Sequence, residues 1–110
     1  QSSTARTKKY INEAMAEIKL NNPDFAAQEL QDIKTQLLKK SSIGAVSNQL
    51  EKIVKLNDKV KLPLAKLTDL KNKAENLEST IKNMATGFIQ GKITEYKTAA
   101  ISAVRSFFRF

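Results

Sequence analysis

The sequence of 110 residues contains no cysteine and no histidine. Thiol nucleophiles, imidazole general bases, disulfides and zinc sites built from these residues are therefore excluded. Ser, Thr, Tyr, Lys, Asp and Glu remain for catalysis, but a chain this short rarely forms the pocket that they need. We therefore expect a protein that is not an enzyme and that holds no metal and no cofactor.

Glycine and proline are scarce too, with three glycines and two prolines. In the long segments between them, apolar residues recur at intervals of three and four, which is typical of helices rather than strands. The sequence therefore predicts an all-α fold, a compact antiparallel bundle of four to five helices that forms one domain over residues 1–110. The predicted helices cover residues 4–20, 23–40, 42–61, 64–86 and 92–108.

Two of these boundaries depend on particular residues. Asn22 and Pro23 are predicted to start the second helix, because Asn is a good N-cap and Pro suits the first helical position. Gly87 and Gly91 are predicted to form a turn, because the apolar stripe resumes out of phase at Ile93. A fifth helix follows from this second boundary.

Long hydrophobic runs are also absent. No window approaches the roughly 18 consecutive apolar residues of a membrane-spanning helix, so no transmembrane segment is expected. The chain begins with Gln1 rather than Met, which suggests that a signal peptide or another leading segment has been removed. Secretion is therefore compatible with the sequence, although a lack of cysteine is more usual inside cells.

The formal net charge is +8, and it is unevenly distributed. Residues 1–33 carry four basic and five acidic side chains, whereas residues 34–110 carry fifteen and six. Lys52, Lys55 and Lys59 share one face of the predicted third helix. They are either ordinary surface lysines or a docking patch for an acidic protein, a polyanion or an anionic lipid surface. Specific nucleic-acid recognition is not expected, because only three of the nineteen basic residues are arginines.

The last six residues, RSFFRF, bring together three phenylalanines and two arginines. The helix predicted over residues 92–108 is amphipathic, and its apolar face either seals the bundle or meets a partner. Because the three phenylalanines point in different directions, at least one should be available to a partner. Phe beside Arg is typical of protein-binding surfaces, and a basic helix of this kind also suits an anionic membrane surface. The candidate partner-binding residues are Lys52, Lys55, Lys59, Arg105, Phe107, Phe108, Arg109 and Phe110.

The segment QSSTARTKKYINEAMAEIKLNNPDF opens a basic, cysteine-free and predicted helical chain of this length. In this combination the sequence resembles the anopheline mosquito salivary proteins of the anophensin/albicin type. The resemblance covers the chain as a whole, and no binding residue is carried over from it. It implies a secreted, non-enzymatic inhibitor of host defence that acts on plasma proteins.

The resemblance implies two kinds of target. Some members of the family block the alternative pathway of complement by binding its convertase, and others restrain contact-phase activation by binding factor XII and kininogen. We expect the complement convertase first and the contact factors second. The residues alone support two other hypotheses, a peripheral protein that binds anionic lipid or polyanion surfaces and an adaptor inside a cell. We expect the protein to be a monomer.

Overall fold

The part of the chain that the structure describes is all-α, as predicted. The computed structural model describes residues 5–59 and 61–108, without the side chains of residues 57–59. Its helices are α1 (Ala5–Asn21), α2 (Ala27–Leu38), α3 (Ser41–Lys59) and α4 (Leu64–Phe107).

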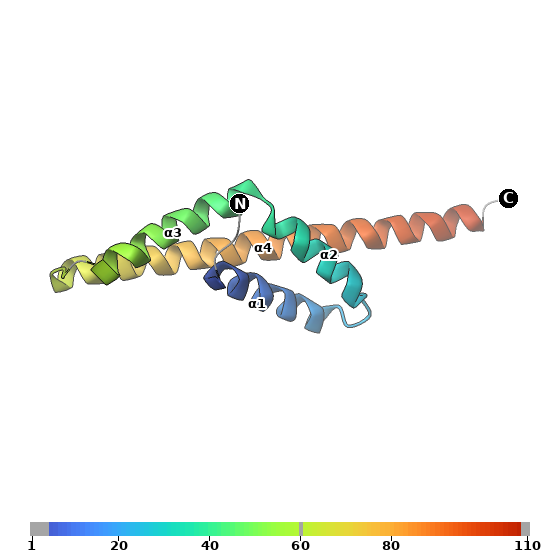
Figure 1. The fold of residues 1–110 in the computed structure, drawn as a ribbon. Coiled ribbons are helices and arrows are strands. Elements are labelled where there is room, and N and C mark those ends of the chain that lie inside the picture. Colours follow the sequence, from blue (N-terminus) through green and yellow to red (C-terminus); the bar gives the residue numbers. More distant parts are fainter. Residues whose placement is uncertain (1–4, 60, 109–110) are drawn as a thin grey trace.

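The long helix α4 is the axis against which the other three helices pack (Figure 1). α1 runs along the middle of α4 in the same direction, α2 returns beside it, and α3 continues from α2 toward the N-terminal end of α4. The molecule measures 72 × 26 × 18 Å. The compact bundle is not confirmed, because the C-terminal end of α4 extends past α1, α2 and α3 (Figure 1).

The predicted turn at Gly87 and Gly91 is wrong, because α4 passes through both glycines without interruption. Neither glycine has a positive φ angle, and a Cβ atom added to either would meet nothing within 4 Å. With 3.6 residues per turn, a spacing of four residues rotates the buried face by about 40° at each step. The apolar stripe changes phase because the buried face shifts gradually around one continuous helix. Residues 92–107 are therefore part of α4 and form no separate fifth helix. The buried side chains of α4 follow this spacing and are Ile81, Ala85, Ile89 and Ile93.

The predicted start of the second helix is also wrong, because residues 22–26 form a turn and α2 begins at Ala27. The Asn22 side chain serves α1 instead, donating a hydrogen bond from Nδ2 to the carbonyl oxygen of Ile18 over 3.0 Å. The turn buries Phe25, whose side chain is only 8% exposed. Burying a phenylalanine contributes about 1.5–3 kcal/mol, whereas an N-cap contributes about 1 kcal/mol. Packing therefore outweighs the local signal at this boundary.

The remaining helix boundaries lie within two residues of those predicted, and α4 begins directly after Pro63. Proline disfavours helix in the residue before it, here Leu62, which explains why α3 does not run on into α4.

The hydrophobic core lies where α1, α2 and α3 meet the middle of α4. A buried hydrogen bond crosses this region from α1 to α3, where Thr7 Oγ1 donates to Ser47 Oγ over 2.8 Å. Both hydroxyls are thereby satisfied inside an otherwise apolar layer. Beside the α4 residues named above, the buried apolar side chains are Ile11, Ala14, Ile18, Phe25, Leu30, Ile33, Leu37, Ile43 and Leu50.

Replacing the two helical glycines with alanine tests the continuity of α4. We expect Gly87→Ala and Gly91→Ala each to raise the free energy of unfolding by about 0.5–1 kcal/mol, because Ala favours the helix and both sites have room for a methyl group. Urea unfolding followed by circular dichroism measures the change. A loss of stability in either variant would instead indicate a turn at these residues.

Candidate functional site

Residues 97–108 form the free end of α4, the segment that runs on beyond the other three helices (Figure 1). Every residue of this segment is exposed. Its large apolar side chains are among the exposed ones: Phe107 is 77% exposed, Phe108 67%, Val104 55% and Ile101 54%. The first of the two alternatives for the C-terminus, in which this face seals the bundle, therefore holds for Ile93 and Tyr96 at its start but is wrong for Val104, Phe107 and Phe108.

The exposed apolar face of the free end continues the buried face of α4. Ala100, Val104 and Phe107 follow Ile93 and Tyr96 at intervals of three and four, which keeps them on one side of the helix. The core-facing surface of α4 thus extends about two turns past Ala100, which still lines a pocket with the α1–α2 turn. None of the described residues covers this apolar face, and exposed apolar patches are candidate sites of interaction with another molecule.

Basic residues border this apolar face. Lys97 and Arg105 lie on the adjacent side of the helix, with Ile101 midway between them at a spacing of four residues. The opposite side is polar but uncharged, with Thr98, Ser102 and Ser106 at the same spacing. The free end is therefore amphipathic, and its charged residues are positive.

The last turn of α4 is held in a defined geometry. The backbone N–H of Phe108 donates to the carbonyl oxygen of Val104 over 3.1 Å. The rings of Phe107 and Phe108 meet edge to face, with centroids 5.2 Å apart and an interplanar angle of 79°. Arg105 lies in the last turn, where its positive charge is favourable at the negative end of the helix dipole. These contacts present two aromatic rings and one guanidinium on a single turn.

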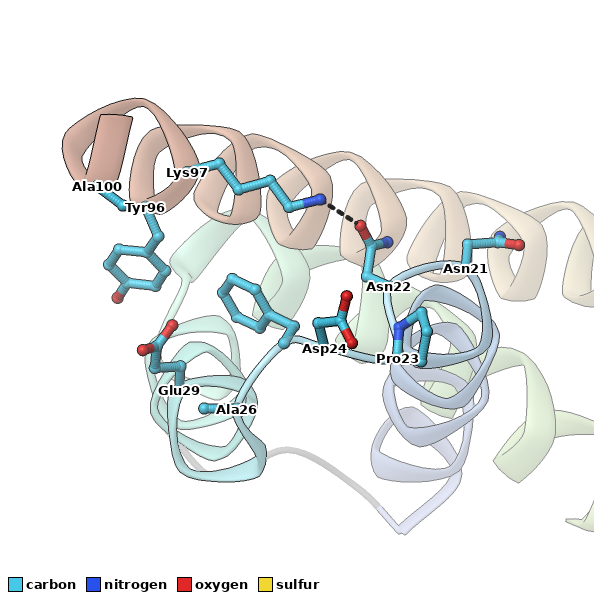
Figure 2. A pocket seen from close by; sticks show the side chains of 10 residues that line it. Asn21, Asn22, Pro23, Asp24, Ala26, Glu29, Tyr96, Lys97 and Ala100 are labelled. Carbon is cyan, nitrogen blue, oxygen red and sulfur yellow. Dashed lines mark hydrogen bonds between the residues drawn. The ribbon is translucent and has the colours of Figure 1, made fainter. Parts of the chain in front are cut away.

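The turn between α1 and α2 fixes the base of the free end (Figure 2). Lys97 Nζ donates to Asn22 Oδ1 over 2.8 Å. The rings of Phe25 and Tyr96 stack beside this bond, with centroids 5.9 Å apart and an interplanar angle of 23°. Lys19 Nζ holds the turn from the α1 side by donating to the carbonyl oxygens of Pro23, over 3.0 Å, and of Phe25. The direction in which the free end leaves the core is therefore set by side chains on both elements.

An open pocket of about 620 Å³ lies at this junction (Figure 2). Its walls come from the α1–α2 turn, from the first turn of α2 and from Tyr96, Lys97 and Ala100 of α4. Two carboxylates, Asp24 and Glu29, line it on the side away from α4.

The structure separates the predicted partner-binding residues into two groups. Lys52 and Lys55 are exposed on α3, which packs along the N-terminal part of α4. Arg105, Phe107 and Phe108 lie at the opposite end of α4 (Figure 1). The two groups therefore do not form one binding surface. The side chain of Lys59 and the whole of Arg109 and Phe110 lie outside the described residues.

Sequence reasoning missed the features that depend on tertiary contacts. The Thr7–Ser47 hydrogen bond joins residues 40 positions apart, and the Lys97–Asn22 bond joins residues 75 positions apart. Lys40 and Lys92 both lie over the ring of Phe88, with Nζ atoms 4.5 and 5.5 Å from its centroid. Asn22 was recognised as a capping residue, but its side chain bonds to the end of α1 rather than to the start of α2.

Alanine substitutions distinguish the free end from the core. We expect Phe107→Ala and Phe108→Ala each to change the free energy of unfolding by less than about 1 kcal/mol, because both rings are exposed. The control Ile89→Ala should cost about 2–5 kcal/mol, because it leaves a cavity at a fully buried site. Guanidinium unfolding measures all three values. Equal losses at Phe107 and Ile89 would mean that the C-terminus packs into the core.

Within residues 5–59 and 61–108, no cluster of three or more acidic side chains is placed to hold a metal ion. No helix among the described residues is long and apolar enough to cross a membrane.

Comparisons with models of protein families, with curated proteins and with solved structures found no match to this chain.

Proposed function

We propose that this protein is a secreted, non-enzymatic inhibitor that binds a host plasma protein through the free end of α4. The observation that carries the proposal is the exposure of Phe107 and Phe108 on a helical turn that also carries Arg105. Aromatic residues and arginine are the side chains that most often dominate the binding energy of protein interfaces. The free end is already helical before binding, so fewer backbone torsions lose freedom when a partner docks.

The size of the aromatic pair indicates how far the interface extends. Two phenylalanines at this exposure offer roughly 300 Å² of surface, whereas each partner in a stable complex buries about 800 Å². The partner must therefore also cover neighbouring groups. The apolar face through Val104 and Ala100 leads to the pocket at Tyr96 and Lys97, which makes this junction the remaining part of the interface.

The net charge and the resemblance described above support the choice of target. The net charge of +8 favours rapid association with an acidic protein surface. The resemblance to salivary inhibitors of the anophensin/albicin type points to the alternative-pathway convertase of complement, with the contact factors, factor XII and kininogen, as the second choice. Such an inhibitor works by covering a surface on its target and needs no catalytic group of its own.

A double variant at the free end tests this assignment. We expect Arg105→Glu with Phe108→Ala to reduce inhibition at least about tenfold, because it reverses the positive charge and removes an aromatic contact. Both residues are exposed, so thermal stability should be nearly unchanged. A haemolysis assay that depends on the alternative pathway measures inhibition, and thermal unfolding measures stability.

The matched control places the same changes at the other end of α4. Lys66 and Leu64 are both exposed there, and Lys66→Glu with Leu64→Ala alters the charge by the same amount. This control should retain full inhibition. Haemolysis that proceeds unchanged with excess wild-type protein would remove the convertase as target. Pull-down of purified factor XII and kininogen then tests the second choice.

The amphipathic pattern of the free end also favours a second candidate function, binding to an anionic lipid surface. Lys97 and Arg105 border the apolar face, where long basic side chains reach lipid headgroups while Phe107 and Phe108 enter the interface. The uncharged side formed by Thr98, Ser102 and Ser106 would face water.

Vesicle sedimentation tests this second candidate. We expect vesicles containing phosphatidylserine to carry the protein down at low salt, and the bound fraction to fall steeply as salt screens the charges. Neutral phosphatidylcholine vesicles are the control and should bind far less. Absence of sedimentation with the anionic vesicles at low salt would reject the lipid-binding function.

A further inference from the structure

A second surface lies at the other end of the molecule, where α3 packs against the N-terminal part of α4 and the start of α1 contributes Arg6 (Figure 1). This arm consists of residues 49–59 of α3 and residues 64–80 of α4. Its apolar residues Ile53, Leu70 and Leu77 are only half-buried, whereas Ile81 and Ile89 in the middle of α4 are fully buried. Leu50, at the inner end of the arm, is still buried, but the half-buried residues beyond it leave apolar surface that a third helix can cover.

A groove of about 500 Å³ runs along one side of the arm. Ile53, Leu70 and Leu77 supply its apolar surface, and Lys52 of α3 and Lys73 of α4 line it from the two helices. None of the described residues that line it carries a carboxylate. The remaining lining residues are Gln49, Asn76 and Thr80.

The charge of this groove is largely uncompensated. Among the described residues, Lys52 takes part in no ion pair within 4.0 Å. Lys73 Nζ lies 3.5 Å from Asp69 Oδ2, but both side chains are more than 60% exposed, and such a pair contributes little in water. Two ammonium groups on opposite walls of an apolar groove favour an occupant with negative charge on its flanks and apolar residues between them.

The dimensions match a short helix. From Leu70 to Thr80 the groove follows eleven residues of α4, a rise of about 15 Å, which corresponds to about three turns of a packed helix. A third helix lying between α3 and α4 would place its apolar side chains against Ile53, Leu70 and Leu77 in the usual manner of helix packing.

We propose that this groove binds an acidic amphipathic helix of a partner protein. Apolar residues of that helix, spaced three and four apart, would cover Leu70 and Leu77, and its flanking carboxylates would pair with Lys52 and Lys73. A second copy of this chain fits less well, because its exposed apolar helix, the free end of α4, carries Lys97 and Arg105 and would bring positive charge to positive charge.

The opposite side of the arm shows the same combination of apolar and basic groups. A groove of about 550 Å³ lies there, and Ile53 and Leu70 line it as well. Among the residues that the structure describes, those with a charge in its lining are Arg6 and Lys71, both basic. Arg6 is already paired with Glu51, at 3.6 Å, so the side with Lys52 and Lys73 is the better site for a carboxylate.

A synthetic peptide tests the groove without knowledge of the natural partner. The probe is a helical peptide of about four turns with leucines on one face and glutamates beside them, added to the full chain carrying labelled methyl groups. We expect the methyl signals of Ile53, Leu70 and Leu77 to shift on titration, because the leucines of the probe pack against them. A peptide of the same composition in scrambled order, which has no apolar face, should leave these signals in place.

Charge variants give the matched comparison. Lys52→Glu with Lys73→Glu should weaken the probe at least about tenfold, because two attractive pairs become repulsive. Lys55→Glu with Lys66→Glu makes the same change in net charge at exposed positions of the arm that line neither groove, and it should retain the affinity. NMR titration of each variant provides both dissociation constants.

Several results would overturn this inference. Absence of shifts at millimolar probe, shifts confined to Ile101 and Val104, or equal binding of a probe with lysine in place of glutamate would each reject an acidic helix in the groove. Shifts that grow with protein concentration alone would make a second copy the occupant, and stronger shifts with anionic vesicles would make it a lipid. The inference concerns a surface remote from the free end, so inhibition of complement can fail without affecting it.

Discussion

The buried side chains of α4, which are Ile81, Ala85, Ile89 and Ile93, hold the molecule together. The last three belong to the core cluster that α4 forms with residues of α1, α2 and α3. Each of these residues removes apolar surface from water, which contributes about 25 cal/mol for each Å² buried. Because they occupy only the middle third of a helix of 44 residues, the core covers the centre of α4 and leaves both of its ends less covered. The elongated shape follows directly from this arrangement.

The two ends of α4 differ in chemistry for the same reason. At the N-terminal end α3 still accompanies α4, so apolar residues there are half-buried beside lysines and form grooves. At the C-terminal end nothing among the described residues accompanies α4, so two phenylalanines stand exposed beside an arginine. One core thus leaves two different surfaces at opposite ends of the molecule. The proposed plasma-protein site is at the C-terminal end of α4, and the proposed helix-binding groove is at the N-terminal end.

Local patterns in the sequence predicted the helical class and most helix boundaries, because intervals of three and four and the position of Pro63 act within a few residues. They failed where long-range packing competes with a local preference. Gly87 and Gly91 stay helical because Ile89 and Ile93 are buried on both sides of Gly91, and Asn22 does not cap α2 because Phe25 packs against Tyr96. The sequence left open whether Phe107 and Phe108 pack into the core or stand exposed. Their exposure depends on where α1, α2 and α3 end along α4, which local patterns do not specify.

The continuity of α4 has a consequence for backbone hydrogen exchange. An isolated helix of twelve residues is marginal in water because its first turn is costly to form. The free end of α4 does not have to form that turn, because it continues directly from the part of α4 where Lys97 bonds to Asn22. Its helicity therefore propagates outward, helped by Ala99, Ala100 and Ala103, and weakens with distance from the core. Amide protons along this segment should exchange in order of position, with those nearest Phe108 exchanging first and those near Tyr96 last.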